Sequence, residues 1–242
     1  MIALLDIGNS RVKYCLLHDG ERTSQCAVMN NVVSNNFLTE NFADVDKIIV
    51  SNVGYKKLTD TISAWCDANK VVYQQIFSEL KKNTVTSGYE NPNQLGIDRW
   101  LALVGAAHLY PNKNLLIIDA GTATTIDFLT AAGQHQGGWI LAGIKMLVSS
   151  VLTETNQVTA NRVEKESLAF GINTSENVHN AAWAATVGAI NLAVSKIQKQ
   201  GVVLNKIIIT GGNGHILASV IPQKTTVLAE LVFDGLEAYS ED

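Results

Sequence analysis

The chain has 242 residues, of which 47% are hydrophobic, and a formal net charge of −4 at pH 7. This hydrophobic content can build a packed core, which excludes a disordered chain. The acidic balance argues against a protein that binds nucleic acid through a basic face. The length allows one large domain or two lobes of about 115 residues each.

The cysteines and the apolar segments indicate the cellular compartment of the protein. Cys15, Cys26 and Cys66 are odd in number and lack the spacing of a metal site, as is typical of buried or incidental thiols in a reducing compartment. Asp6 interrupts the first apolar run, no basic leader precedes it, and the longest mostly apolar segment is too short to span a bilayer. We therefore expect a soluble cytoplasmic protein with no membrane partner.

The first half of the chain begins with a hairpin and ends with a helix. Apolar runs and their spacing predict, in order, strands over 2–7 and 12–17, a further strand over 47–53, a helix over 55–68, a strand over 71–77, and a helix over 98–110 after a loop with Pro92. Asp98 and Arg99 fall in the first turn of that last helix. The helix dipole accounts for Asp98 alone, but a cation there is unfavourable. Arg99 therefore needs an anionic partner, which can be a neighbouring carboxylate or a ligand, and the pair fits either a base with an anion anchor or a structural ion pair.

The second half begins with an apolar strand over 115–118 that runs into Asp119, Gly121 and Thr122. Apolar residues return at 126–129, beside Asp127. Carboxylates that flank small hydroxyl residues and open amides suit a phosphate with its metal ion. The elements expected after this turn are a loop over 133–138 that ends in paired glycines, a helix over 139–152, a surface loop over 154–165, a helix over 176–199 capped by Thr174 or Ser175, a strand over 206–210, a short helix to Val220 and a closing helix over 228–238.

The two halves repeat each other. A shift of 113 residues places Asp6 on Asp119 and Gly8 on Gly121, and a second echo aligns the strand and turn over 47–54 with those over 206–213. Two echoes in the same order indicate a duplicated unit. We predict two similar lobes, 1–113 and 114–242, with one phosphate turn each. The P-loop, the protein-kinase motifs, the Gly-x-Ser-x-Gly elbow and zinc-type histidine spacing are all missing from the sequence.

Two Asp-x-Gly turns in duplicated lobes, followed by a Gly-Gly turn, resemble the actin-like ATPase and sugar-kinase superfamily. The particular set resembles the type III pantothenate kinase family. The motifs that carry this resemblance, in family order, are Asp6-Ile7-Gly8-Asn9-Ser10-Arg11-Val12-Lys13, Gly96-Ile97-Asp98-Arg99-Trp100, Asp119-Ala120-Gly121-Thr122-Ala123-Thr124-Thr125-Ile126-Asp127, Gly137-Gly138 with Gly143, Gly171-x-x-Thr174, and Thr210-Gly211-Gly212. The family usually has proline where this chain has Ala142, a difference that removes no chemical group.

The resemblance implies an α/β fold with two ribonuclease H-like lobes, each a mixed sheet flanked by helices. It implies ATP-dependent phosphorylation of pantothenate, the first step towards coenzyme A, with Mg²⁺, a monovalent cation (K⁺ or NH₄⁺) and a homodimer. Asp98 would be the general base, Asp119 would bind the monovalent cation and Asp6 would lie near Mg²⁺. The implied ATP-binding residues are Asp6, Ile7, Gly8, Asn9, Ser10, Arg11, Val12, Lys13, Gly121 and Thr122, and the implied pantothenate-binding residues are Tyr89, Gly96, Ile97, Asp98, Arg99 and Thr174.

Two other functions remain open at this stage. A phosphohydrolase of the same superfamily would release phosphate without an acceptor alcohol. A non-catalytic nucleotide-binding protein with an accessory role in transcription would lack the catalytic carboxylates, all of which this sequence contains.

Overall fold

The computed structural model describes residues 1–155, 159–161 and 166–241, and the chain forms two compact units. The first unit consists of Met1–Leu109 together with Glu230–Asp242, and the second of Tyr110–Ala229. This division differs from the predicted lobes, 1–113 and 114–242, because the C-terminal segment returns to the first unit. The surface loop predicted over 154–165 lies largely outside the described residues.

The first unit is built on a mixed sheet in the order β3-β2-β1-β5-β6, with β4 also paired to β2. Strand β1 runs antiparallel to β2 and parallel to β5, and β5 runs parallel to β6. A separate short pair, β7–β8, follows. The strands are β1 (Ile2–Ile7), β2 (Arg11–His18), β3 (Glu21–Arg22), β4 (Cys26–Met29), β5 (Lys47–Asn52), β6 (Val72–Gln75), β7 (Lys81–Lys82) and β8 (Val85–Thr86).

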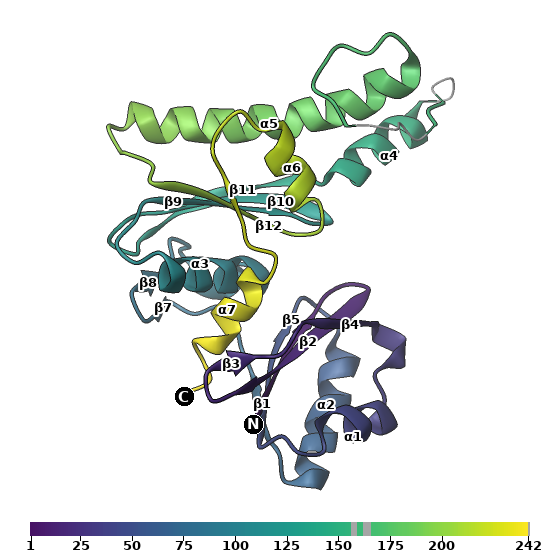
Figure 1. Cartoon of the computed structure of the whole chain (residues 1–242), viewed down its shortest axis with the longest axis vertical. Helices are drawn as coiled ribbons and strands as arrows, with labels where there is room; N and C mark the ends of the chain where they lie inside the picture. The colour runs from purple at the N-terminus through teal and green to yellow at the C-terminus, as the bar shows by residue number, and fades with distance from the viewer. Residues whose placement is uncertain (156–158, 162–165, 242) are drawn as a thin grey trace. The chain divides into compact units, whose positions relative to one another are not determined.

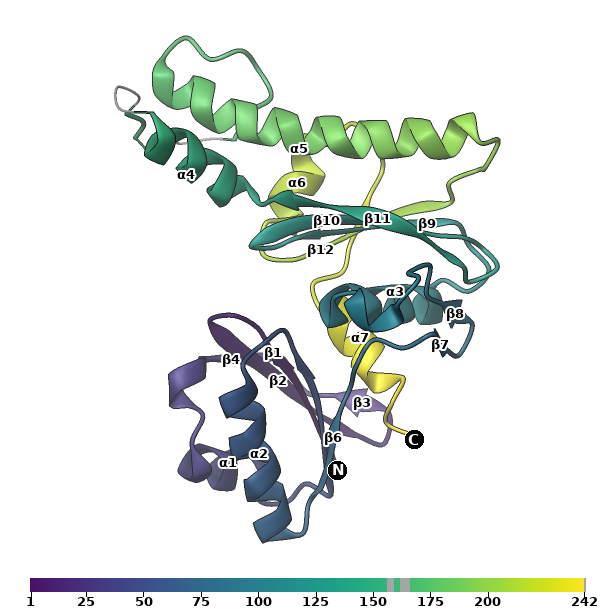
Figure 2. The same ribbon diagram turned by 180° about the vertical axis from the view of Figure 1, so that it is seen from behind.

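Helices α1 (Asn35–Phe42) and α2 (Lys56–Asn69) cover one face of this sheet (Figure 2). The core between them holds Leu5, Ile48 and Ile62, which are almost completely buried. Helices α3 (Ile97–Leu109) and α7 (Leu231–Glu237) pack against β1 and β5, and short 3₁₀ turns, η1 (Asn30–Val32) and η2 (Pro92–Gln94), lie in the connections.

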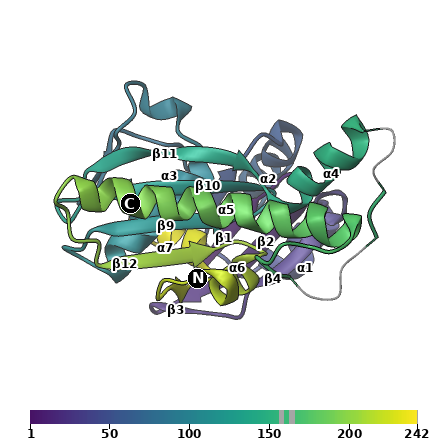
Figure 3. The same cartoon turned by 90° about the horizontal axis from the view of Figure 1, so that it is seen from above.

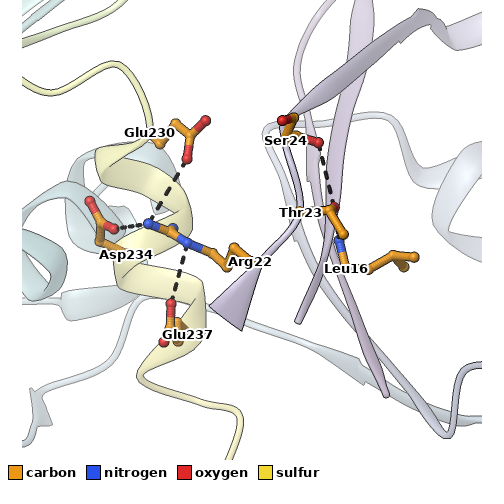
Figure 4. A network of polar contacts seen from close by, with 7 residues as sticks. All are labelled: Leu16, Arg22, Thr23, Ser24, Glu230, Asp234 and Glu237. Carbon is orange, nitrogen blue, oxygen red and sulfur yellow. Dashed lines mark hydrogen bonds and ion pairs between the residues drawn. The ribbon is translucent and has the colours of Figure 1, made fainter. Parts of the chain in front are cut away.

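Within the first unit, an arginine of β3 forms ion pairs with the C-terminal segment (Figure 4). Arg22 of β3 forms ion pairs with three carboxylates that lie on or just before α7. Its Nε is 3.4 Å from Glu237 Oε2, its Nη2 is 3.9 Å from Glu230 Oε2, and the same Nη2 donates to Asp234 Oδ1. The charge cluster joins parts of the chain that are far apart in sequence.

The second unit contains a sheet in the order β11-β10-β9-β12-β13. The long helix α5 runs along one face of it, with α4 and α6 on the same side (Figures 1 and 3). Buried residues that join the helices to the sheet include Ile118, Ile190 and Ile209. The elements are β9 (Leu115–Ala120), β10 (Ala123–Leu129), β11 (His135–Ala142), α4 (Ile144–Glu154), α5 (Thr174–Lys199), β12 (Lys206–Thr210), α6 (Gly214–Val220) and β13 (Thr226–Val227).

The two sheets have the same topology. In each, the first strand pairs antiparallel with the second and parallel with a later strand, which in turn has a parallel neighbour at the edge. Parallel pairing needs a crossover connection, and here each crossover carries helical segments. The predicted α/β fold of two duplicated lobes with mixed sheets is therefore confirmed.

Two predictions in the second half were wrong. Residues 139–142 belong to strand β11, and the helix that follows starts only at Ile144, so Gly137 and Gly138 lie within a strand and expose no amides of a helix start. The N-cap of α5 is Asn173 rather than Thr174 or Ser175. Its side chain accepts a hydrogen bond from the Glu176 amide at 2.9 Å and donates one to the Glu176 carboxylate at 2.8 Å, a reciprocal cap.

Candidate functional site

The first predicted phosphate turn joins β1 to β2. Within it the Gly8 amide donates to the Arg11 carbonyl at 3.0 Å, and Asn9 and Ser10 are exposed. Asn30 braces the turn from outside, because its Nδ2 donates to the Gly8 carbonyl at 3.0 Å and its amide to the Ser10 carbonyl at 3.1 Å. The result is a hydrogen-bonded turn with exposed residues, of the kind that can receive a phosphate through its amides.

The predicted ATP-binding residues of this turn are not equivalent. Ile7 and Val12 are buried in the core at 0% and 1% exposure, so only their main chains are available to a ligand. Arg11 is exposed, and Lys13 lies directly across the β1–β2 pair from Asp6. The apolar side chains of the hairpin thus pack into the core, while Arg11 is exposed and Lys13 lies across from Asp6.

Asp6 is the carboxylate at the centre of this group. Ser51 lies opposite it on β5 and donates a hydrogen bond from Oγ to Asp6 Oδ1 at 2.8 Å. Burial raises the pKa of the Asp6 carboxyl, and the nearby negative charge of Asp98 raises it too, whereas the Ser51 hydrogen bond and the positive charge of Lys13 lower it. Asp6 and Asp98, predicted from separate motifs, therefore lie within electrostatic reach of each other.

Asp98 occupies the first turn of α3, as predicted, and is partly buried. Its Oδ1 accepts a hydrogen bond from the Arg99 amide at 2.8 Å. A side chain at Gly96 would collide with that carboxylate, since an added Cβ would lie 2.6 Å from Oδ1. Glycine before the helix therefore leaves room for the Asp98 side chain.

Arg99 and Tyr89 form a pair on the same unit. Arg99 is only 4% exposed, its Nη1 donates to the Tyr89 hydroxyl at 2.7 Å, and its guanidinium lies 5.6 Å from the centre of the Tyr89 ring. A planar guanidinium held in this way is suited to a carboxylate or phosphate. The predicted substrate residues from the first unit, Tyr89 and 96–99, thus come from one loop and one helix start.

The second predicted turn, Gly121–Thr122, joins β9 to β10 within the second unit. Two glycines lie in close contact with this turn and with Asp119 before it. An added Cβ on Gly143 would collide with the carbonyls of Gly121 and Thr122, and an added Cβ on Gly211 would collide with the Asp119 carboxylate. Gly211 also has a φ of +86°, which favours glycine. Backbone segments from three connections therefore converge on Asp119 and on the exposed Thr122.

The second unit also contains Asp127 and Thr174. Asp127, expected beside the phosphate turn, is 2% exposed and its Oδ1 lies 2.9 Å from Nε2 of the buried His135, so it belongs to the packed sheet. Thr174 is exposed at the first residue of α5. Ser51 and Asn30 were missed from sequence; the alignment of residues 47–54 with 206–213 was the available signal for Ser51.

The structure also limits how cations could be held. Within the part of the chain that the structure describes, no three histidine, cysteine or acidic side chains come together as a metal cluster. A cation here would depend on one or two carboxylates with phosphate oxygens and water, which is the usual manner of Mg²⁺. Asp6 fits this role, since its partly buried carboxylate lies near the end of β1, beside the predicted phosphate turn.

Similar proteins place the chain in a family. The sequence profile of the family described as type III pantothenate kinase matches residues 2–196. Type III pantothenate kinase of Colwellia psychrerythraea is 49% identical over 250 residues, which cover 99% of this chain and 100% of that protein. The enzyme of the same name from Pseudoalteromonas translucida is 36% identical and covers 90% of this chain and 87% of its own.

Solved structures agree on the fold. A Campylobacter jejuni protein named for the Baf family of transcriptional activators superposes with a TM-score of 0.64 at 22% identity, covering 99% of this chain and 98% of its own. A Sinorhizobium meliloti protein described as a 2-dehydro-3-deoxygalactonokinase also gives 0.64, at 11% identity, covering 100% and 98%. At these identities the likeness extends to the actin-like ATPase and sugar-kinase fold alone. The sequence matches go further, and the chain belongs to the type III pantothenate kinase family.

Proposed function

We propose that this chain transfers the γ-phosphoryl group of ATP to the primary hydroxyl of pantothenate, giving 4′-phosphopantothenate in the first step of coenzyme A synthesis. Family membership supports the reaction. The structural observation that carries the mechanism is the position of Asp98, at a helix start and within electrostatic reach of Asp6 beside the phosphate turn.

In this mechanism the Asp98 carboxylate takes the proton of the pantothenate hydroxyl as that oxygen attacks phosphorus. Arg99, held by Tyr89, binds the pantothenate carboxylate or the transferring phosphoryl group. Backbone amides over 6–13 bind phosphate oxygens in the first unit, and Gly121 and Thr122 are the proposed phosphate contacts of the equivalent turn in the second unit. Mg²⁺, when bound near Asp6, supplies positive charge to the phosphate oxygens. Phosphoryl transfer needs positioning and charge neutralisation rather than a covalent intermediate.

We also propose a monovalent-cation site, a homodimer and a cytoplasmic location. Asp119, with backbone converging on it, is the proposed site of K⁺ or NH₄⁺. Phe170 and Ile172, at 103% and 94% exposure close to Thr174, support a homodimer that covers them and completes the pantothenate site.

Three free cysteines support a reducing, cytoplasmic location. No helix in the described residues is long and apolar enough to cross a membrane.

A coupled assay of ADP formation tests the function. We expect ADP only when ATP, Mg²⁺ and pantothenate are all present, and faster turnover in potassium than in sodium salt. Phosphate release without pantothenate would instead identify a phosphohydrolase. Nucleotide binding with no turnover under any condition would favour the non-catalytic regulatory role.

Asp98→Asn tests the general base. It keeps the size of the side chain and removes the proton acceptor, so kcat should fall by roughly a hundredfold or more while the affinities for ATP and pantothenate change little. Asp67→Asn, a change of the same kind at an exposed position of α2, is the matched control and should keep full activity. Normal turnover in Asp98→Asn would remove Asp98 from the base role.

A further inference from the structure

Ser51 is a buried polar residue with no role in the mechanism proposed above. It lies on β5, fully shielded at 0% exposure, opposite Asp6 in the parallel β1–β5 pairing. Its hydroxyl donates to Asp6 Oδ1 at 2.8 Å. A hydrogen bond from a hydroxyl to a carboxylate is charge-assisted, and it is stronger than a hydrogen bond between neutral groups.

The bond fixes the direction of the Asp6 side chain. Lys13 flanks Asp6 on β2, on the opposite side from Ser51, so the carboxylate lies between a cation and a hydroxyl from its two neighbouring strands. Side chains opposite one another in paired strands share a face of the sheet. The hydrogen bond from Ser51 to Oδ1 restricts the orientation of the Asp6 carboxylate.

The second unit repeats the strand position of the hydroxyl residue. Thr210 lies opposite Asp119 in the parallel β9–β12 pairing, as Ser51 lies opposite Asp6, and it is 3% exposed. Both duplicated sheets thus place a buried hydroxyl residue beside the acid that precedes the phosphate turn. The repetition concerns the strand position of the hydroxyl residue, and the hydrogen bond that gives this position a role is the one from Ser51 to Asp6.

We infer that Ser51 is a positioning residue for Asp6: its hydroxyl holds the carboxylate that would bind the Mg²⁺ of MgATP. This inference rests on the proposed function, since it takes MgATP as the ligand of the first turn. Removal of a group that orients a metal-binding side chain typically lowers metal affinity by roughly ten- to a hundredfold.

Calorimetric titration with a non-hydrolysable ATP analogue, once with Mg²⁺ and once with EDTA, tests the inference. In Ser51→Ala the gain in affinity that Mg²⁺ provides should fall by roughly tenfold or more, while binding in EDTA stays unchanged. Ser51→Thr should keep the gain, since Thr210 shows that threonine fits the equivalent strand position. Thr59→Val is the control: it removes another buried hydroxyl of the first unit, one that donates to the Lys56 carbonyl, and should leave the gain intact.

Three results would overturn the role of Ser51. They are a full Mg²⁺ gain in Ser51→Ala, equal losses of affinity with and without Mg²⁺, and a loss in Ser51→Thr as large as that in Ser51→Ala. The proposed function is tested separately, by pantothenate-dependent ADP formation in the unmodified protein. If that activity is present, any of the three results contradicts the role of Ser51 alone. An unmodified protein that gains no affinity from Mg²⁺ would contradict both ideas.

Discussion

The thiols of Cys15 and Cys66 are buried, and burial raises the pKa of each to about 11, whereas Cys26 is exposed on β4. The thiolate is the reactive form, and at pH 8 a thiol of pKa 11 is ionised in roughly one molecule per thousand. We therefore expect a thiol reagent at pH 8 to label one cysteine in the native protein and three in urea. Native Cys26→Ser should resist labelling, and rapid modification of two or more native thiols would contradict this.

The same raised pKa values make a prediction for alkaline stability. A thiol whose pKa is about 9 when unfolded and about 11 when folded favours the folded state below pH 9, and this contribution is lost as the pH rises from 9 to 11. The free energy of unfolding, measured in urea, should decline over this interval. The decline should be smaller in Cys66→Ala; an unchanged decline there would show that other groups cause it.

At the residue scale, sequence alone located the acids but not the groups that orient them. Asp6 stands out because it interrupts an apolar strand, and Asp98 because the unfavourable cation next to it, Arg99, draws attention to the start of that helix. Ser51 does not, since a serine at the end of a strand is unremarkable until the register places it opposite Asp6. Asn30 is likewise found only when the fold returns it to the Gly8 carbonyl.

Helices α3 and α7 pack through two glycines. An added Cβ on Gly105 would lie 2.5 Å from the Leu231 carbonyl oxygen, and one on Gly235 would collide with the Leu101 carbonyl. Gly235→Ala should therefore lower the free energy of unfolding by about 1–3 kcal/mol, because the colliding atom is main chain and the helices must move apart. Chemical denaturation measures this directly.

Gly188→Ala is the matched control for that change. Gly188 lies within α5, and an added Cβ there would have nothing within 4 Å. Alanine should stabilise that helix by about 0.5–1 kcal/mol, so the two substitutions have opposite expected signs. If both variants were equally destabilised, close packing of α3 on α7 would not be the reason.

At the element scale, most strands and helices followed from apolar runs, but β11 did not. Ile140 points outward from this edge strand and is 65% exposed, so residues 139–142 are apolar on both faces and show no alternation. A continuous apolar run of this kind also fits a helix. The position of α7 was beyond prediction as well, because the glycines that permit its contact with α3 lie far apart in sequence.

At the scale of the whole molecule, Arg22 joins the C-terminal segment to the N-terminal sheet (Figure 4). Arg22→Gln leaves three carboxylates without their shared cation and should lower the free energy of unfolding by roughly 1–3 kcal/mol. The loss should be smaller in 1 M salt, which screens repulsion among the acids. Lys57→Gln, at an exposed position of α2, should change stability by less than about 0.5 kcal/mol. Equal effects of the two changes would assign the loss to net charge alone.

The return of the chain to its first unit has a consequence for biosynthesis. When α3 leaves the ribosome, the surface it shares with α7 is still uncovered, and all of Tyr110–Ala229 must be translated before the buried Leu231, Phe233 and Leu236 arrive. At ordinary elongation rates this wait is on the order of ten seconds. The second unit, continuous in sequence, can mature as an insert during the interval. Of the two units, the first thus begins to emerge earlier and is completed later.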